Sequence, residues 1–155
     1  MELYFAYGSN LKLKQITSRC PSTQTIGEAI LHEHKLTFPI KSDRWGSAGV
    51  AGFIEDSSEQ THGVLYEMSK DDLNKLDEIE GYYANEEERI YTRTEISVQL
   101  LNDDIINCWT YIIPVPSPGF PFSPSAEYID TIIYGAKEHE LCPKYIEHLE
   151  GWKEY

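Results

Sequence analysis

The chain alternates short apolar runs with polar, turn-forming segments, a pattern typical of β-strands joined by hairpins. The clearest stretch lies in the second half, where Thr94, Ile96 and Val98 fall on one face and Glu95 and Ser97 on the other. The polar segments at residues 32–35 and 55–61 predict turns, and residues 102–104 predict a hairpin. Strands are therefore expected over residues 3–7, 29–31, 36–38, 50–54, 63–66, 90–101 and 105–113.

Apolar residues at helical spacing predict four helices. The best marked covers residues 69–81, with Ser69 as N-cap, Asp72 at the reciprocal capping-box position and Gly81 as the C-terminal stop. Asn10 is expected to cap an earlier helix. The other two helices are expected from residue 124 to about 138, with Ile129, Ile132, Ile133 and Ala136 on the apolar side, and over residues 142–151.

Strands outnumber helices in this order of elements and come in hairpins. The sequence therefore predicts an α+β fold, with a mixed, strongly curved sheet or small barrel and flanking helices. No internal repeat, low-complexity tract or linker divides the 155 residues, so we expect a single domain over residues 1–155.

Glu80 stands out on the helix predicted over residues 69–81. At about 100° per residue it projects between Leu73 and Leu76, whereas Glu78 points the opposite way. Glu80 should therefore face the protein body, in a last turn where the helix dipole disfavours negative charge. Both effects raise the pKa of a carboxyl group, which is how a general base is tuned towards neutrality. The ordinary alternative is a solvated glutamate at a frayed helix end.

Composition excludes several classes of partner and compartment. The formal net charge is −13 and the isoelectric point is near 4.7, so the surface repels phosphate backbones and anionic membranes. Nucleic-acid and membrane partners are therefore not expected. The start of the chain lacks the pattern of a secretion signal. Cys20, Cys108 and Cys142 are widely spaced, as is typical of reduced thiols, and a cytoplasmic location is expected.

The tetrapeptide Tyr7-Gly8-Ser9-Asn10 lies between a predicted strand and a predicted helix. Glycine allows the backbone to approach a ligand, and consecutive amides at a helix start form a concave anion site. Such a site can hold a carboxylate or stabilise an oxyanion. Taken alone, the tetrapeptide fits an ordinary turn equally well.

Other candidate residues give weaker signals. His32 and His34 form a two-histidine pattern that could begin a zinc site, but no third ligand follows at suitable spacing. Cys108 is expected to pack in the core rather than to act as a nucleophile. Tyr91 and Tyr111 are possible pocket residues among eleven tyrosines, most of which must be structural.

Several motifs resemble those of γ-glutamylcyclotransferases. Tyr-Phe-Ala-Tyr-Gly-Ser-Asn-Leu at residues 4–11 is similar to that family's N-terminal signature, and Leu-Asp-Glu-Ile-Glu-Gly at residues 76–81 is similar to the end of its catalytic helix. Gly-Val-Leu-Tyr at residues 63–66, Tyr111, Ser-Pro-Ser-Ala-Glu-Tyr at residues 123–128 and Gly-Ala-Lys-Glu at residues 135–138 also resemble family positions. The resemblance extends over nearly the whole chain in the same order.

The resemblance implies an enzyme that releases 5-oxoproline and a free amine from a small γ-glutamyl amide. In that family the glutamate before the glycine is the base, which corresponds to Glu80 here. Substrate binding is then expected at Ala6, Tyr7, Gly8, Ser9, Asn10 and Tyr128. No cofactor and no metal are expected, because the α-amine of the substrate is itself the nucleophile. The oligomeric state is not readable from the sequence, and a homodimer is one option.

Two loops depart from the family pattern, and both are expected to border the pocket and meet the leaving group. Residues 82–88 are acidic, and residues 114–124 contain five prolines. The leaving group is therefore left open between an amino acid, another amine and a γ-glutamylated biosynthetic intermediate such as an antibiotic precursor. Two other functions compete with the enzyme, namely a non-catalytic relative that binds a small ligand and an interaction module that uses the acidic surface.

Overall fold

The computed structural model of the chain describes residues 1–42, 47–82 and 90–155. Within these residues, strands and helices follow one another along the chain in the mixed order that the sequence predicts. The elements are β1 (Glu2–Ala6), η1 (Ser9–Leu11), α1 (Leu13–Arg19), β2 (Gln24–Ser42), β3 (Ala48–Met68), α2 (Lys70–Ile79), β4 (Thr92–Leu100), β5 (Ile105–Ile112), α3 (Ala126–Glu138), α4 (Pro143–Gly151) and η3 (Trp152–Glu154).

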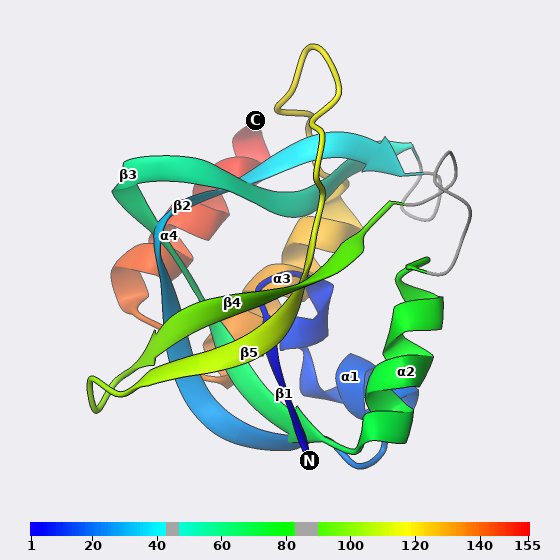
Figure 1. Cartoon of the computed structure of the whole chain (residues 1–155). Coiled ribbons are helices and arrows are strands. Elements are labelled where there is room, and N and C mark those ends of the chain that lie inside the picture. The colour runs from blue at the N-terminus through cyan, green and yellow to red at the C-terminus, as the bar shows by residue number, and fades with distance from the viewer. Residues whose placement is uncertain (43–46, 83–89) are drawn as a thin grey trace.

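The five strands form a closed barrel in the order β1-β3-β2-β4-β5 (Figure 1). Neighbouring strands are antiparallel except β1 and β5, which close the barrel in parallel through the pair Tyr4 and Trp109. The predicted hairpin is present, with Gln99 opposite Ile105 at its closed end. The α+β class and the curved, barrel-like sheet are therefore confirmed.

Two strands are much longer than the sequence pattern predicted. The pairs expected at residues 29–31 and 36–38, and at residues 50–54 and 63–66, each belong to one continuous strand, β2 or β3. The predicted turns are wrong because the chain bends there without leaving the sheet. Glu33 has φ = 60°, and the register shifts between His32 and His34, where residues 56–59 of β3 are accommodated. Such bulges allow one long strand to serve two sides of a barrel.

The helix predicted over residues 69–81 is confirmed as α2, but its N-terminal cap differs from the prediction. The Ser69 hydroxyl accepts the Asp72 amide, as expected. The Asp72 carboxylate does not return to Ser69. It accepts the hydroxyl and the amide of Ser22, and the Ser22 hydroxyl caps the Ser69 amide instead. These bonds to Ser22 hold the pKa of Asp72 below its usual value and tie α2 to the turn before β2.

Helix α3 packs closely against η1, the short helix that follows β1. Its predicted apolar face is confirmed, since Ile129, Ile132, Ile133 and Ala136 are buried. The approach depends on Gly135, where a Cβ atom would lie 2.5 Å from both the Leu11 carbonyl carbon and the Lys12 nitrogen. Gly135 thereby fixes the position of α3 relative to the turn that follows β1.

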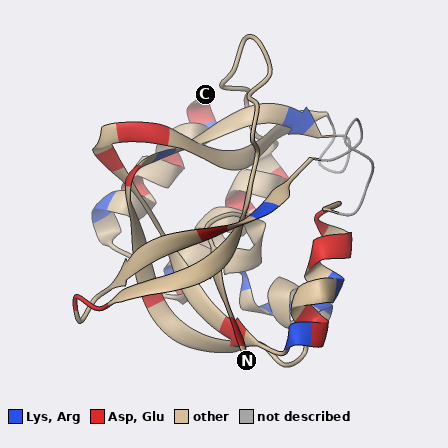
Figure 2. Ribbon diagram, in the orientation of Figure 1, with Lys and Arg blue, Asp and Glu red and all other residues tan. Residues whose placement is uncertain are grey.

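Charge is spread over the ribbon rather than collected on one element. Figure 2 shows acidic segments at the tip of the β4–β5 hairpin, on β3 and along α2. Among the described residues, no helix combines the length and the apolar character needed to cross a membrane.

We expect Gly135→Ala to lower the free energy of unfolding by about 2 to 3 kcal/mol, because the added methyl group meets backbone atoms that cannot move aside cheaply. This loss exceeds the gain of about 1 kcal/mol in helix propensity. Gly151→Ala is the matched control, since no atom lies within 4 Å of its Cβ position. It should leave stability unchanged or slightly raised. Urea denaturation measures both, and equal stability of the two variants would contradict the close contact.

Candidate active site

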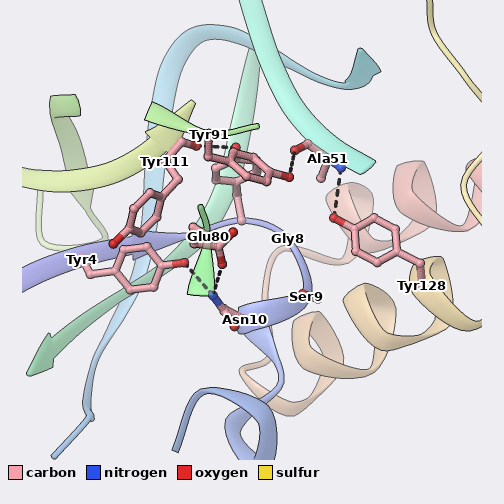
Figure 3. A pocket seen from close by; sticks show the side chains of 10 residues that line it. Tyr4, Gly8, Ser9, Asn10, Ala51, Glu80, Tyr91, Tyr111 and Tyr128 are labelled. Atoms are coloured by element: carbon pink, nitrogen blue, oxygen red, sulfur yellow. Dashed lines mark hydrogen bonds between the residues drawn. The ribbon is translucent and has the colours of Figure 1, made fainter. Parts of the chain in front are cut away.

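A pocket of about 330 Å³, including its open mouth, lies where β1, η1 and the end of α2 meet β3, β5 and α3 (Figure 3). Its lining contains one carboxylate and is otherwise dominated by tyrosine and by the turn after β1. The lining residues are Tyr4, Tyr7, Gly8, Ser9, Asn10, Ala51, Glu80, Tyr91, Tyr111 and Tyr128.

Glu80 faces this pocket. Its side chain is only 12% exposed, so it points towards the protein body, as the helical spacing predicted. Glu78 is exposed on the other side of α2. The orientation is set by the helix end, where the amides of Gly81 and Tyr82 bond to the carbonyls of Glu78 and Asp77 and Gly81 has φ = 77°. This is a Schellman motif, which Gly81 adopts without the steric penalty of a side chain. It places Glu80 as the C-cap residue.

Asn10 holds the Glu80 carboxylate in place. Its Nδ2 atom donates to Glu80 Oε1 at 3.3 Å and to Tyr4 Oη at 3.0 Å, as Figure 3 shows. Its Oδ1 atom accepts from Arg19 Nη1 at 3.0 Å and from Gln15 Nε2 at 3.1 Å. The predicted role of Asn10 as a helix cap is therefore wrong. Helix α1 begins after Lys12 without a side-chain cap, because the Asn10 amide is turned towards Glu80.

The Arg19 guanidinium lies on the other side of the same carboxylate. Its Nη1 atom is 3.7 Å from Glu80 Oε1, and its side chain is 20% exposed. A cation at this distance favours the ionised form of Glu80, whereas burial and the C-terminal end of α2 favour the neutral form. The carboxylate thus lies between opposing electrostatic influences.

The tyrosine hydroxyl groups of the pocket remain protonated at neutral pH. Burial, followed by the nearby Glu80 charge, raises the pKa of Tyr4 well above 10. Burial likewise raises the pKa of Tyr7, Tyr91 and Tyr128. Because Tyr4 Oη accepts the Asn10 N–H, its own proton is left to be donated elsewhere. The pocket therefore surrounds a single carboxylate with neutral hydroxyl groups, and Tyr4 has an O–H to donate.

The hydroxyl groups of Tyr91 and Tyr128 meet the backbone of β3 at Ala51. Tyr91 donates to the Ala51 carbonyl at 2.8 Å, and Tyr128 accepts the Ala51 amide at 3.0 Å (Figure 3). Tyr128 thus closes one wall of the pocket, next to Gly8, where a Cβ atom would lie 3.5 Å from Tyr128 Oη.

The turn at Tyr7 to Asn10 forms the floor of the pocket. Within η1 the amides of Leu11 and Lys12 bond to the carbonyls of Gly8 and Ser9. The amides of Ser9 and Asn10 precede the first of these bonds and have no acceptor inside the helix. Ala6 was expected to bind substrate together with this turn, but its side chain is fully buried and does not line the pocket.

A second carboxylate, Asp77, lies one turn before Glu80 and is fully buried. It accepts the Tyr111 hydroxyl at 2.6 Å, and Arg93 Nη1 lies 3.3 Å from its other oxygen. The Tyr111 carbonyl in turn accepts the Tyr7 hydroxyl at 2.6 Å. Burial and the bond to Asp77 raise the pKa of Tyr111. This chain of contacts joins the barrel wall to the helix that carries Glu80.

A second pocket adjoins the first and has a volume of about 390 Å³, again including its mouth. The two share a boundary formed by Ser9, Glu80, Tyr91 and Tyr128. The residues found only in the second pocket are Arg19, Ser42, Val50 and Ile90.

The loop at residues 114–124 was expected to border the pocket, and this expectation is wrong. None of its residues lines either pocket, because it runs along β2, where the amides of Ser117 and Phe122 bond to the carbonyls of Pro39 and Phe38. The acidic loop at residues 82–88 lies outside the described residues, apart from Tyr82.

The remaining candidate residues have ordinary contacts. His32 Nε2 contacts Gln99 Oε1, and His34 Nδ1 contacts the His32 carbonyl. In the part of the chain that the structure describes, no group of three or more His, Cys, Asp or Glu side chains could hold a metal ion. Cys108 is buried in the core as predicted, and burial raises the pKa of its thiol to about 12.

Sequence reasoning missed four residues of this arrangement, namely Tyr4, Arg19, Asp77 and Arg93. A signal was present for Arg19, because Gln15 and Arg19 are four residues apart and share one face of α1. Asp77 flanks the apolar stripe of α2, which also hinted at burial. Tyr4 and Arg93 carried no local signal that separates them from ordinary strand residues.

Comparison with known proteins identifies the same family as the motifs. Residues 60–149 match the model of the AIG2-like family. The mouse protein named gamma-glutamylcyclotransferase is 34% identical over 153 residues, which cover 96% of this chain and 77% of the mouse protein. The human protein of the same name is 33% identical over 152 residues, which cover 96% of this chain and 77% of the human protein.

A solved structure named gamma-glutamyl cyclotransferase superposes with a TM-score of 0.86 at 32% identity, covering 96% of this chain and 86% of the other. Sequence and fold thus agree with these proteins over nearly the whole chain. The chain belongs to the γ-glutamylcyclotransferase family.

Proposed function

We propose that this cyclotransferase converts a γ-glutamyl amide into 5-oxoproline and a free amine, with Glu80 as the general base. The observation that carries the proposal is the Glu80 carboxylate itself, which is 12% exposed, is held by Asn10 and faces a pocket of protonated tyrosines. A glutamate whose only role is solubility is expected on the exposed surface, because burying a carboxylate costs stability.

The first step forms the ring. The α-ammonium group of the substrate gives one proton to the Glu80 carboxylate, and the freed nitrogen lone pair attacks the γ-carbonyl carbon. The π electrons of that carbonyl move to oxygen and give a tetrahedral oxyanion. Attack within one molecule gains a high effective concentration, so the protein needs to hold the substrate bent and to move protons.

The second step releases the amine. Glu80 returns its proton to the leaving nitrogen, the carbonyl re-forms, and the C–N bond breaks with its electron pair going to the departing amine. The ring nitrogen loses its extra proton to Glu80, which passes it to the amine. Glu80 ends as a carboxylate, as it began, and neither step of the reaction oxidises or reduces any group.

The γ-glutamyl half of the substrate is assigned to the first pocket. Its α-carboxylate and the developing oxyanion need donors, and the amides of Ser9 and Asn10 with the hydroxyl group of Tyr4 supply them. Tyr128 closes this half of the site. Every substrate of the class shares the γ-glutamyl group, so its recognition belongs to the rigid turn after β1.

Glu80→Gln should abolish turnover while leaving fold and substrate binding nearly intact, since the amide has the same shape but cannot accept a proton. Glu78→Gln is the matched control on the exposed face of α2 and should be nearly silent. Chromatography for 5-oxoproline after incubation with a γ-glutamyl amino acid measures both variants. More than a few per cent of wild-type activity in Glu80→Gln would remove Glu80 from the role of base.

The rate should rise with pH as Glu80 loses its proton, because only the carboxylate can accept one. It should then stay level for as long as the α-ammonium group of the substrate keeps its proton, because the raised pKa values of Tyr4, Tyr7 and Tyr91 keep their hydroxyl groups protonated over this range. Initial rates at saturating substrate test this. A profile that is flat from pH 4 to pH 8 would count against a titrating base.

Gly8→Val should lower kcat/KM for every γ-glutamyl substrate by a similar factor. The new side chain projects into the floor of the first pocket beside Tyr128, where the shared half of the substrate is assigned. A substrate panel with different leaving amines measures the effect. A change in the ranking of leaving amines, rather than a common loss, would contradict the assignment of this pocket.

A further inference from the structure

We propose that Arg19 binds a carboxylate on the leaving half of the substrate, and that the enzyme distinguishes γ-glutamyl α-amino acids from γ-glutamyl amines through this residue. The inference rests on the proposed function, because it assigns the second pocket to the departing amine. It makes Arg19 the residue that determines leaving-group specificity.

The position of Glu80 assigns the two pockets to the two halves of the substrate. Glu80 must reach both the attacking and the leaving nitrogen, and it lies on the boundary that the pockets share. With the γ-glutamyl half in the first pocket, the scissile bond lies at this boundary. The leaving amine then extends into the second pocket.

Arg19 has the geometry to receive a carboxylate there. In the contacts described above, only Nη1 is used, at 3.0 Å from Asn10 Oδ1 and 3.7 Å from Glu80 Oε1. A guanidinium group carries five N–H donors in a planar fork that matches a carboxylate. The bond to Asn10 also fixes the orientation of the fork, so little side-chain freedom remains to be lost on binding.

The charge balance of the site favours the same assignment. Among the described residues that line the two pockets, Arg19 is the only Lys, Arg or His. A leaving amino acid brings a second carboxylate close to Glu80, in a protein of net charge −13, and this carboxylate requires a cation when it loses water. A simple alkylamine makes no such demand. Val50 and Ile90 offer apolar contact to an amino-acid side chain in the same pocket.

The test uses two substrates that differ only by the carboxylate, γ-glutamyl-L-alanine and γ-glutamyl-ethylamine. The wild-type enzyme should favour the alanine substrate in kcat/KM. Arg19→Gln should reduce this preference about ten- to a hundredfold, as expected for the loss of a charge-assisted bidentate contact. Any effect of Arg19 on Glu80 itself lowers both rates and cancels in the ratio. Arg19→Lys should retain part of the preference.

Lys14→Gln is the matched control, because it removes one positive charge from an exposed position on the same helix and should leave the ratio unchanged. Equal losses for both substrates in Arg19→Gln would overturn the proposal and leave Arg19 only its contacts with Asn10 and Glu80. Turnover of both substrates at equal rates by the wild-type enzyme would also overturn it. Failure of the wild-type enzyme to form 5-oxoproline from either substrate would instead overturn the proposed function, and this inference with it.

Discussion

The hydrogen bonds of one buried side-chain amide connect the parts of this site. Asn10 donates to Tyr4 on β1 and to Glu80 at the end of α2, and it accepts from Gln15 and Arg19 on α1. Asn10 is only 4% exposed, so its amide atoms lie away from bulk water, where a missing hydrogen bond costs stability. The amide therefore couples the barrel, the turn after β1 and two helices into one arrangement.

That arrangement addresses a general difficulty of proton transfer by a carboxylate. A carboxylate that acts as a base must be ionised to accept a proton, and it must be buried enough to keep that proton during the reaction. Burial and the end of α2 favour the neutral form of Glu80, while Arg19 favours the charged one. The surrounding tyrosines stay neutral and donate hydrogen bonds, so they neither compete for the proton nor add charge.

The second buried carboxylate shows how α2, the helix that ends at Glu80, is attached to the barrel. Asp77 is paired with Arg93 of β4 and accepts the hydroxyl of Tyr111 on β5. Without Arg93, the buried carboxylate of Asp77 would have no compensating charge. The contacts that Asp77 makes with Arg93 and Tyr111 therefore hold α2 against the barrel. The geometry of Glu80 is consequently tied to the same strands that form the wall of the pocket.

The sequence alone determined the family, the α+β class, the helix that carries Glu80 and the direction in which Glu80 points. The family follows from motifs along the chain and the α+β class from the order of the elements, whereas the helix and the direction of Glu80 follow from Ser69, Gly81 and the spacing between them. It did not determine the unbroken course of β2 and β3, the role of Asn10 or the contacts of Arg19 and Asp77. Those features depend on which distant elements meet when the barrel closes. The polar residues near Glu33 are compatible both with a bulge inside one long strand and with a turn between two short strands. Local sequence cannot distinguish the two outcomes, because the deciding hydrogen bonds come from another strand.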